Sequence, residues 1–301
     1  MESSVVKQTI MQKIKEYFVF MKFRLSALVA VSALASYLFV GGSDSTIILY
    51  LLVGGMLVTA ASNGTNQIWE RELDKLMKRT QNRPLPQGLM SVNEGFAVVA
   101  ICLISGTALL YMINLYSALL GLLAYFLYVF VYTPLKRKTP WAVFVGAIPG
   151  AIPPLLGAIA HTGEFGLIPG ILFFVQFTWQ FPHFWAIAWV MYDDYKAGGF
   201  SLLPSKEGKT KGSAFQIVVY SLALIPFSLL PWIMGITGGY SFVFAIVFGI
   251  GFFILAYRLY LSLEVKDAKR LMFASFIYLP IIQFVYVFDR VDEEILKLLG
   301  L

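Results

Sequence analysis

Long apolar runs alternate with short polar connections along almost the entire chain. Nine of these runs are long enough to cross a bilayer, because a transmembrane helix needs about 20 mostly apolar residues. They cover residues 18–40, 45–66, 93–114, 116–134, 141–160, 166–190, 213–236, 239–262 and 271–289. Since a backbone in lipid must satisfy its own hydrogen bonds, the pattern predicts an all-α integral membrane protein with nine transmembrane helices in a single bundle.

The polar remainder is too short for a separate soluble domain, so we expect one polytopic membrane domain over residues 1–301. Residues 1–17 lack the apolar core and small-residue cleavage site of a signal peptide. Apolar side chains recur there at helical spacing, which predicts an amphipathic lead-in at the membrane interface. Two longer connections, 67–92 and 191–212, carry most of the candidate chemistry and are interpreted as active-site loops.

Composition and charge agree with a membrane protein. Hydrophobic residues make up 58% of the chain and charged residues 13%, well below the charged content of an average soluble domain. Of the 23 Lys and Arg residues, 21 fall in the N-terminal region or near or beyond the ends of the second, fourth, sixth and eighth runs. Because Lys and Arg favour cytoplasmic loops, we expect a cytoplasmic N-terminus. Basic loops beside anionic lipid account for the net charge of +6 without a nucleic-acid partner.

Oxygen ligands stand where the second apolar run ends. Asn66, Glu70 and Asp74 are four residues apart, so a helix brings them near one face. Mg²⁺ prefers such hard oxygen ligands and is usually held by one or two carboxylates together with substrate phosphates. Spacing alone is equally compatible with acids in a solvated loop beside the membrane. Cations that could hold phosphate follow directly, at Lys78, Arg79 and Arg83.

The connection after the sixth run is a weak copy of this arrangement. It places Asp193 and Asp194 at the end of an apolar run, and Lys196 follows them. An even number of runs separates the two connections, so they lie on the same side of the membrane. We therefore expect two acid-bearing helix ends to face each other and to hold Mg²⁺ ions with a diphosphate between them.

Polar side chains inside the apolar runs are a further signal, because they usually face a cavity or a partner helix. Gln176, Gln180 and His183 would share one stripe with Asp194 on a continuous helix. We interpret the two glutamines as hydrogen-bonding links between helices and keep His183 as a candidate substrate-binding residue. The fifth run contains several Gly and Pro residues, which predict a kinked or broken helix.

The first segment, read in full, is Asn-x-x-x-Glu-x-x-x-Asp-x-x-Met-x-Arg-Thr-x-x-Arg-Pro-Leu from Asn66 to Leu85. This string resembles the first signature of the intramembrane aromatic prenyltransferases of the UbiA superfamily, and is more similar to their protoheme farnesyltransferase branch. The stretch from Tyr132 to Lys138 resembles the end of the fourth span in that family. The stretch from Trp179 to Leu203, with its acids, is similar to the second signature of the branch.

The nine predicted helices, forming a single bundle around a central cavity, and an active site on the cytoplasmic side match that family. Residues 1–17 are unlike both a signal peptide and an organellar transit peptide, which favours a bacterial plasma membrane. The resemblance implies transfer of the farnesyl group of farnesyl diphosphate to a vinyl group of heme B, with Mg²⁺ as cofactor. The lipid bilayer and a downstream heme-modifying enzyme are the other implied partners. The implied metal ligands are Asn66, Glu70, Asp74, Asp193 and Asp194. Implied catalytic residues are Asn66, Glu70, Asp74, Asp194 and Tyr132, the last facing the allylic cation. Implied substrate-binding residues are Lys78, Arg79, Arg83, Lys136, Arg137, Lys138, His183 and Lys196.

Two departures from the family pattern qualify these expectations. Val190 stands four residues before Asp194, where the wider superfamily often has another acid, so the number of Mg²⁺ ions stays open. The first run begins Lys22-Phe23-Arg24, where relatives commonly have Lys-Pro-Arg. We expect that change to affect only the entry into the helix.

Two alternative functions remain. Prenylation of an aromatic quinone precursor belongs to the same superfamily and would use the same diphosphate chemistry. A secondary transporter would also have many spans, helices interrupted by Gly and Pro, and membrane-embedded acids. The acids here cluster at helix ends beside Lys and Arg, which favours a phosphate site over an ion path.

Overall fold

The computed structural model describes residues 9–291, and within that range the chain is helical apart from connections and one isolated bridge between Thr237 and Arg290. The helices are α1 (Ile10–Phe20), α2 (Phe23–Phe39), α3 (Ser45–Asp74), α4 (Val92–Tyr111), α5 (Leu115–Phe126), the π-helix η1 (Leu127–Tyr132), α6 (Thr133–Leu135), α7 (Ala142–Thr162), α8 (Leu167–Val190), α9 (Tyr192–Ala197), α10 (Lys211–Ile233), α11 (Gly239–Ser262) and α12 (Val265–Phe288). The expected all-α class is confirmed.

The helices of residues 9–291 include fewer candidate membrane spans than the sequence pattern predicts. Seven helical segments in residues 9–291 are long and apolar enough to cross a membrane, or eight if α1 and α2, bent by 50° at their junction, form one span. The helix α2 has only 17 residues, and α8 carries glutamine and histidine side chains that lower its hydropathy. The count of nine spans therefore stays a prediction.

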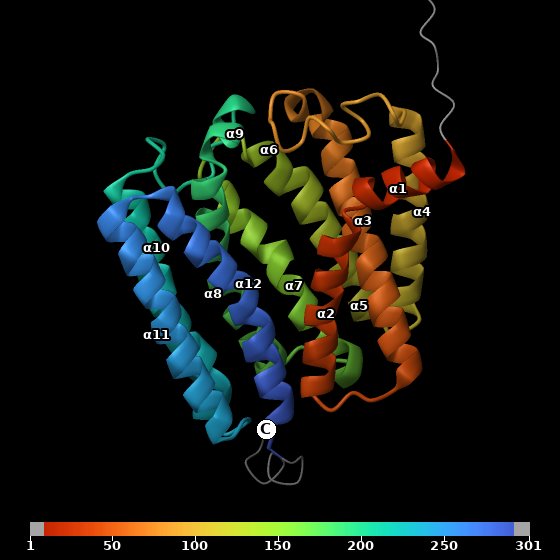
Figure 1. Ribbon diagram of the computed structural model, residues 1–301. Helices are drawn as coiled ribbons and strands as arrows, with labels where there is room; N and C mark the ends of the chain where they lie inside the picture. The colour runs from red at the N-terminus through yellow and green to blue at the C-terminus, as the bar shows by residue number, and fades with distance from the viewer. Residues whose placement is uncertain (1–8, 292–301) are drawn as a thin grey trace, which may run out of the picture.

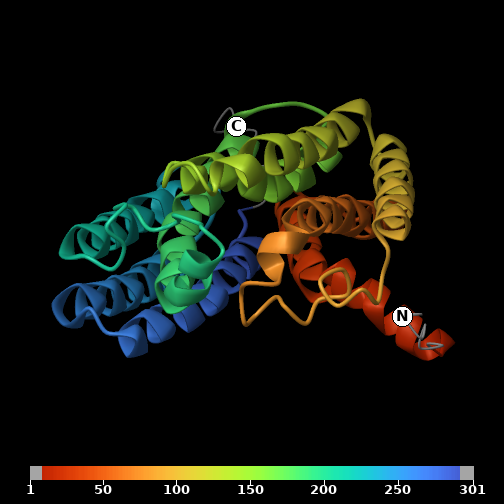
Figure 2. The same cartoon turned by 90° about the horizontal axis from the view of Figure 1, so that it is seen from above.

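The long helices run between two ends of one bundle, with α4 and α10–α11 on opposite sides of it (Figures 1 and 2). The helices α1, α6 and α9 lie at the same end as the connection over residues 75–91 (Figure 1). We call this the charged end, because the cation-bearing connections of the sequence converge on it. The helix α3 continues to Asp74, so the first active-site loop begins at residue 75 rather than at residue 67.

Small residues let neighbouring helices approach closely. At the contact between α3 and α4, a Cβ atom on Gly106 would lie only 2.9 Å from the carbonyl oxygen of Gly54. Gly157 of α7 similarly lies against the backbone of Ala33 in α2. Contacts of this kind are typical of membrane helices, where van der Waals packing replaces the hydrophobic effect as the force between helices. Large apolar side chains such as Ile101, Ile104 and Val247 stay exposed, as expected for a surface in contact with lipid.

The helix α7 is not broken, although it contains Pro149, Pro153 and Pro154. Pro154 has no N–H to donate to the carbonyl oxygen of Gly150 four residues earlier. That oxygen instead accepts a hydrogen bond of 2.7 Å from Gln176 Nε2 of α8. Gln180 Nε2 also donates to the carbonyl oxygen of Ala147, at 2.8 Å. The two glutamines therefore link helices as predicted. Of the two predicted outcomes for this segment, a break does not occur, and a kink stays a prediction.

The lead-in expected over residues 1–17 is described from residue 9 onward, and residues 1–8 lie outside the described part. From Ile10 the chain forms α1, whose apolar side chains Ile10, Met11 and Ile14 are exposed. The helix is held to α4 by Glu94, which accepts hydrogen bonds from Lys13 Nζ at 2.9 Å and from the Tyr17 hydroxyl at 2.6 Å. An amphipathic helix with this exposed apolar side suits the membrane interface.

Candidate active site

The three oxygen ligands predicted at the end of α3 are all buried. Asn66, Glu70 and Asp74 are 3%, 7% and 0% exposed, whereas Glu72 between the last two is exposed. Asn66 Nδ2 donates to Thr133 Oγ1 of α6 at 3.4 Å. Helical spacing has thus turned the three side chains into the bundle, as the sequence predicted.

Two buried ion pairs hold the carboxylates. Lys136 Nζ lies 2.6 Å from Glu70 Oε1, and Arg83 Nη1 lies 2.7 Å from Asp74 Oδ2. Burying a charge is costly unless an opposite charge accompanies it, so each cation compensates one acid. Burial lowers the pKa of Lys136, and the adjacent Glu70 carboxylate opposes that shift. The charged end therefore holds paired positive and negative groups that could both contact a metal diphosphate.

The residues fit Mg²⁺ in chemistry. Asp74 Oδ1 is buried without a hydrogen-bond partner, and the Asn66 amide uses its nitrogen rather than its oxygen to reach α6. Across residues 9–291, no three Asp, Glu, His or Cys side chains form a group able to hold a metal ion by themselves. A magnesium site here therefore needs the amide oxygen and, as is usual for Mg²⁺, oxygen atoms from substrate or water.

Asp194 of α9 meets the connection that follows α3. Its two carboxylate oxygens accept hydrogen bonds from the backbone N–H groups of Lys78 at 3.3 Å and Arg79 at 3.1 Å. The Arg79 guanidinium also lies 5.7 Å from the centre of the Tyr195 ring. The two acid-bearing segments predicted to face each other are thus joined through backbone hydrogen bonds and an aromatic contact.

Aromatic rings border the same cations. The π-helix η1 carries Tyr128 and Tyr132, whose ring centres are 5.2 Å apart, and Lys136 Nζ lies 5.1 Å from the Tyr132 ring. Lys136 Nζ is also 5.3 Å from the ring of Phe200. Single-turn π segments inside helices are frequent at functional sites. Burial raises the pKa of Tyr195, so its hydroxyl stays protonated at neutral pH.

Other predicted residues lie apart from this cluster. The expected continuous stripe from Gln176 to Asp194 is wrong, because α8 ends at Val190 and Met191 has non-helical torsion angles of φ −98° and ψ 20°. His183 instead stacks on Trp179, and its Nδ1 atom lies 2.7 Å from Ser275 Oγ of α12. The remaining predicted side chains, Asp193, Arg137 and Lys138, are exposed at the charged end.

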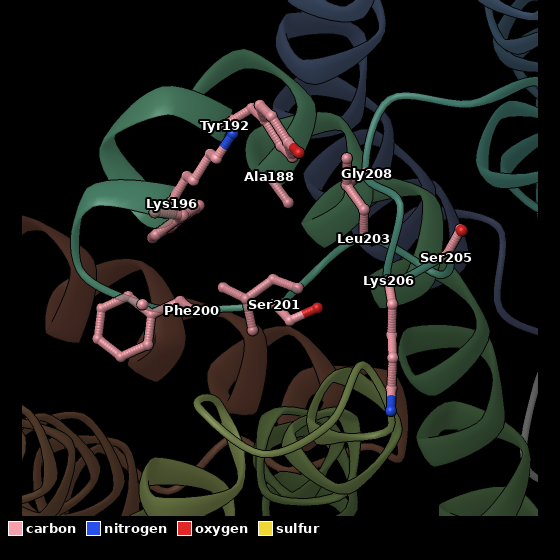
Figure 3. Close-up of a pocket in the computed structure, with 12 residues that line it drawn as sticks. Ala188, Tyr192, Lys196, Phe200, Ser201, Leu203, Ser205, Lys206 and Gly208 are labelled. Carbon is pink, nitrogen blue, oxygen red and sulfur yellow. The ribbon is translucent and has the colours of Figure 1, made fainter.

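A cavity of about 220 Å³ adjoins the site between α9 and the connection after it (Figure 3). Tyr192 and Lys196 line it from α9, and Phe200, Ser201 and Leu203 line it from the connection (Figure 3). The backbone N–H of Ser201 donates to the carbonyl oxygen of Lys136 at 3.0 Å, which fixes the connection to the end of α6. Lys196, predicted to bind substrate, therefore lines this cavity.

The sequence indicated Lys22 only as one of the residues at the start of the first apolar run. Its Nζ donates to Asn63 Oδ1 of α3 at 3.1 Å, and its charge interacts with those of Arg79, Arg83 and Lys136. A Lys at the start of an apolar run is a common anchoring residue, so the sequence carried no signal that separated it from the other cations.

Comparison with known proteins identifies close relatives. Residues 27–279 match the model of the UbiA prenyltransferase family. The chain is 47% identical to a protoheme IX farnesyltransferase of Cytophaga hutchinsonii over 278 residues, covering 91% of this chain and 97% of that protein. It is 46% identical to a protoheme IX farnesyltransferase of Christiangramia forsetii, covering 91% of this chain and 92% of that protein.

Solved structures show the same fold. A digeranylgeranylglyceryl phosphate synthase superposes with a TM-score of 0.76 at 21% identity, covering 92% of this chain and 98% of that one. A UbiA homologue from Archaeoglobus fulgidus bound to GPP and Mg²⁺ superposes with a TM-score of 0.61 at 16% identity, covering 90% of this chain and 99% of that one.

Proposed function

Since this chain belongs to the UbiA prenyltransferase family, we propose that it transfers the farnesyl group of farnesyl diphosphate to a vinyl group of heme B. The observation that carries the proposal is the buried acid face of α3, where Glu70 and Asp74 are each paired with a cation beside Asn66. Relatives that are 46–47% identical over most of their length are protoheme IX farnesyltransferases, which supports this acceptor over a quinone precursor.

In this proposal Asn66, Glu70 and Asp74 hold Mg²⁺, with Asp193 and Asp194 as candidate ligands from the second segment. The bound ion would offset the negative charge that the diphosphate gains as its bond to the allylic carbon breaks. Arg83 and Lys136 would turn from their carboxylates to the phosphate oxygens, since cations that bind carboxylate also bind phosphate. Lys78, Arg79, Arg137 and Lys138 would add positive charge around them.

The aromatic rings beside the ion pairs would face the allylic cation. The faces of Tyr128 and Tyr132 attract positive charge, and the rings exclude water that would otherwise trap the cation. His183 and Lys196 are proposed to contact the acceptor, because they lie outside the ion-paired cluster. Addition of water to the alkylated vinyl group then completes the hydroxyethylfarnesyl substituent, which a downstream heme-modifying enzyme would take up.

We further propose one membrane domain with nine spans in a bacterial plasma membrane. In this topology the charged end faces the cytoplasm, because 21 of the 23 Lys and Arg residues lie in the N-terminal region or near or beyond the ends of runs predicted on that side. A phosphate site at a cytoplasmic helix end also distinguishes the proposal from a transporter, whose coupling acids would lie near the midplane.

The test is the product formed by purified protein from farnesyl diphosphate, heme B and Mg²⁺, identified by mass spectrometry together with released diphosphate. We expect farnesylated heme, and we expect product formation to stop when EDTA removes the metal and to resume when Mg²⁺ is added back. The same reaction is run with hydroxybenzoate or naphthoate in place of heme B. Prenylation of one of these acceptors, without farnesylation of heme B, would assign the quinone-precursor activity. Absence of diphosphate release with every acceptor would favour a transporter.

A further inference from the structure

The junction between α1 and α2 forces one residue into an unfavourable conformation. Lys22 has φ 46° and ψ 50°, in the left-handed region, and α1 and α2 meet there at 50°. Within residues 9–291 only one other residue besides glycine, Leu263, has a positive φ. A side chain with a Cβ atom adopts this region at an energetic cost, so the surrounding structure must hold the turn in place.

Contacts from α2 and α3 supply that support. Gln67 Nε2 of α3 donates to the carbonyl oxygen of Phe20 at 2.5 Å, and Ser26 Oγ of α2 donates to the carbonyl oxygen of Met21 at 3.0 Å. Both bonds satisfy carbonyl groups at the end of α1. The turn is therefore fixed to the same helix that carries the acid face.

The turn directs the Lys22 ammonium toward the site. Its Nζ bonds Asn63 Oδ1 at 3.1 Å, one turn of α3 before Gln67. The charges that act on it are those of Arg83, Lys136 and Arg79, which repel it, and of Glu70, which attracts it. Lys22 thus belongs electrostatically to the ion-paired cluster.

Lys22 differs from the other cations of the cluster because no carboxylate pairs with it in the described chain. Lys136, by contrast, is paired with Glu70, and Arg83 with Asp74. Within residues 9–291, the only hydrogen-bond partner of this half-buried ammonium is the neutral amide of Asn63. The charges of Arg83, Lys136 and Arg79 also act on it, which makes a local excess of positive charge. Such an excess favours an anion, because each added negative charge offsets repulsion among the cations.

We propose that Lys22 binds the diphosphate of the prenyl substrate directly and that the strained turn between α1 and α2 exists to place it there. This inference rests on the proposed function in one respect, that the substrate is a diphosphate. It makes the interfacial helix α1 part of the binding site, because the fixing of α1 to α4 through Glu94 holds one side of the turn.

The test uses inorganic pyrophosphate with Mg²⁺ as the probe, so that it does not depend on the acceptor. Lys22→Met keeps the length of the side chain and removes its charge, and Lys22→Arg keeps the charge. Lys15→Met is the matched control, since Lys15 is an exposed cation of α1. Binding is measured by calorimetry on the full-length protein in detergent, and thermal unfolding is followed with and without the probe.

We expect Lys22→Met to weaken pyrophosphate binding by about tenfold or more, the effect typical of losing one hydrogen bond to a charged group. Its unfolding temperature without the probe should be retained or raised, because repulsion is relieved. Lys22→Arg and Lys15→Met should bind almost as the unchanged protein does. The KM for farnesyl diphosphate should rise in Lys22→Met while the KM for heme B does not.

Equal pyrophosphate affinity in Lys22→Met and the unchanged protein, accompanied by a lower unfolding temperature, would overturn the inference and leave Lys22 as a link to Asn63. The proposed function fails by a different result. If the unchanged protein binds pyrophosphate through Lys22 but forms no farnesylated heme, the inference stands and the acceptor assignment is wrong.

Discussion

Asp74 combines two features within one side chain. One carboxylate oxygen pairs with Arg83 at 2.7 Å, while the other is buried without a partner. A buried oxygen left without a hydrogen bond is costly, and a bound metal ion would offset that cost. Glu72, two residues earlier, has the same charge but an exposed side chain with Lys75 as its partner.

We therefore expect Asp74→Asn to lower turnover by about 10- to 100-fold, as is typical when the surroundings of a metal are altered. The amide keeps the shape of the side chain but not its charge toward Mg²⁺ or Arg83. Glu72→Gln is the matched control and should retain turnover. Diphosphate release per molecule of folded protein measures both variants, and unchanged turnover in Asp74→Asn would contradict the metal site.

At the scale of elements, α7 and α8 depend on each other. Three prolines lie within α7, and Gln176 of α8 supplies a hydrogen bond to Gly150, whose usual donor is absent at Pro154. Gln176 Oε1 in turn accepts from Ser32 Oγ of α2 at 2.7 Å and from Gln283 Nε2 of α12 at 2.9 Å. One amide thus joins four helices in an apolar interior, where each polar group needs a partner.

Replacing Gln176 by Leu should destabilise the bundle by about 1–3 kcal/mol, because several buried polar groups lose their partner at once. The fall should appear in thermal unfolding in detergent, while the KM for farnesyl diphosphate changes little. Phe174→Leu is the control on α8, since Phe174 is exposed. An unfolding temperature equal to that of the unchanged protein would show that water or other side chains replace the amide.

Across the molecule as a whole, the Lys and Arg residues are distributed unequally between the two ends of the bundle. Most of the Lys and Arg residues lie in the connections after α3, α6 and α9, in α1, or at the start of α12, and these segments lie at one end (Figure 1). The connection between α7 and α8 lies at the other end and carries no Lys or Arg. This polarity is what a fixed orientation in a membrane requires.

Cysteine labelling tests the orientation. In a Cys102→Ala background, Lys269→Cys lies at the start of α12 at the charged end and Glu164→Cys lies in the connection after α7. An impermeant maleimide should label Glu164→Cys in intact cells and Lys269→Cys only in inside-out vesicles. The reverse pattern would place the charged end, and the site with it, outside the cytoplasm.

Features that depend on local periodicity and composition could be predicted from the sequence. The helical spacing of Asn66, Glu70 and Asp74 places them near one face of α3, and in the folded chain that face is buried. The apolar runs specified helices, because a backbone in lipid has few other ways to satisfy its hydrogen bonds. The role of the glutamines in α8 also followed from the cost of a polar group in an apolar interior.

Which side chains come into contact depends on how the helices pack. The pairs Glu70–Lys136 and Asp74–Arg83, the contact of Asp194 with the Lys78 and Arg79 backbone, and the approach of Lys22 to Asn63 join segments that spacing alone cannot relate. The break at Met191 likewise separated Asp194 from the stripe that a continuous helix would have given. Charge pairing and backbone direction at helix ends depend on neighbouring elements, which a periodic pattern does not specify.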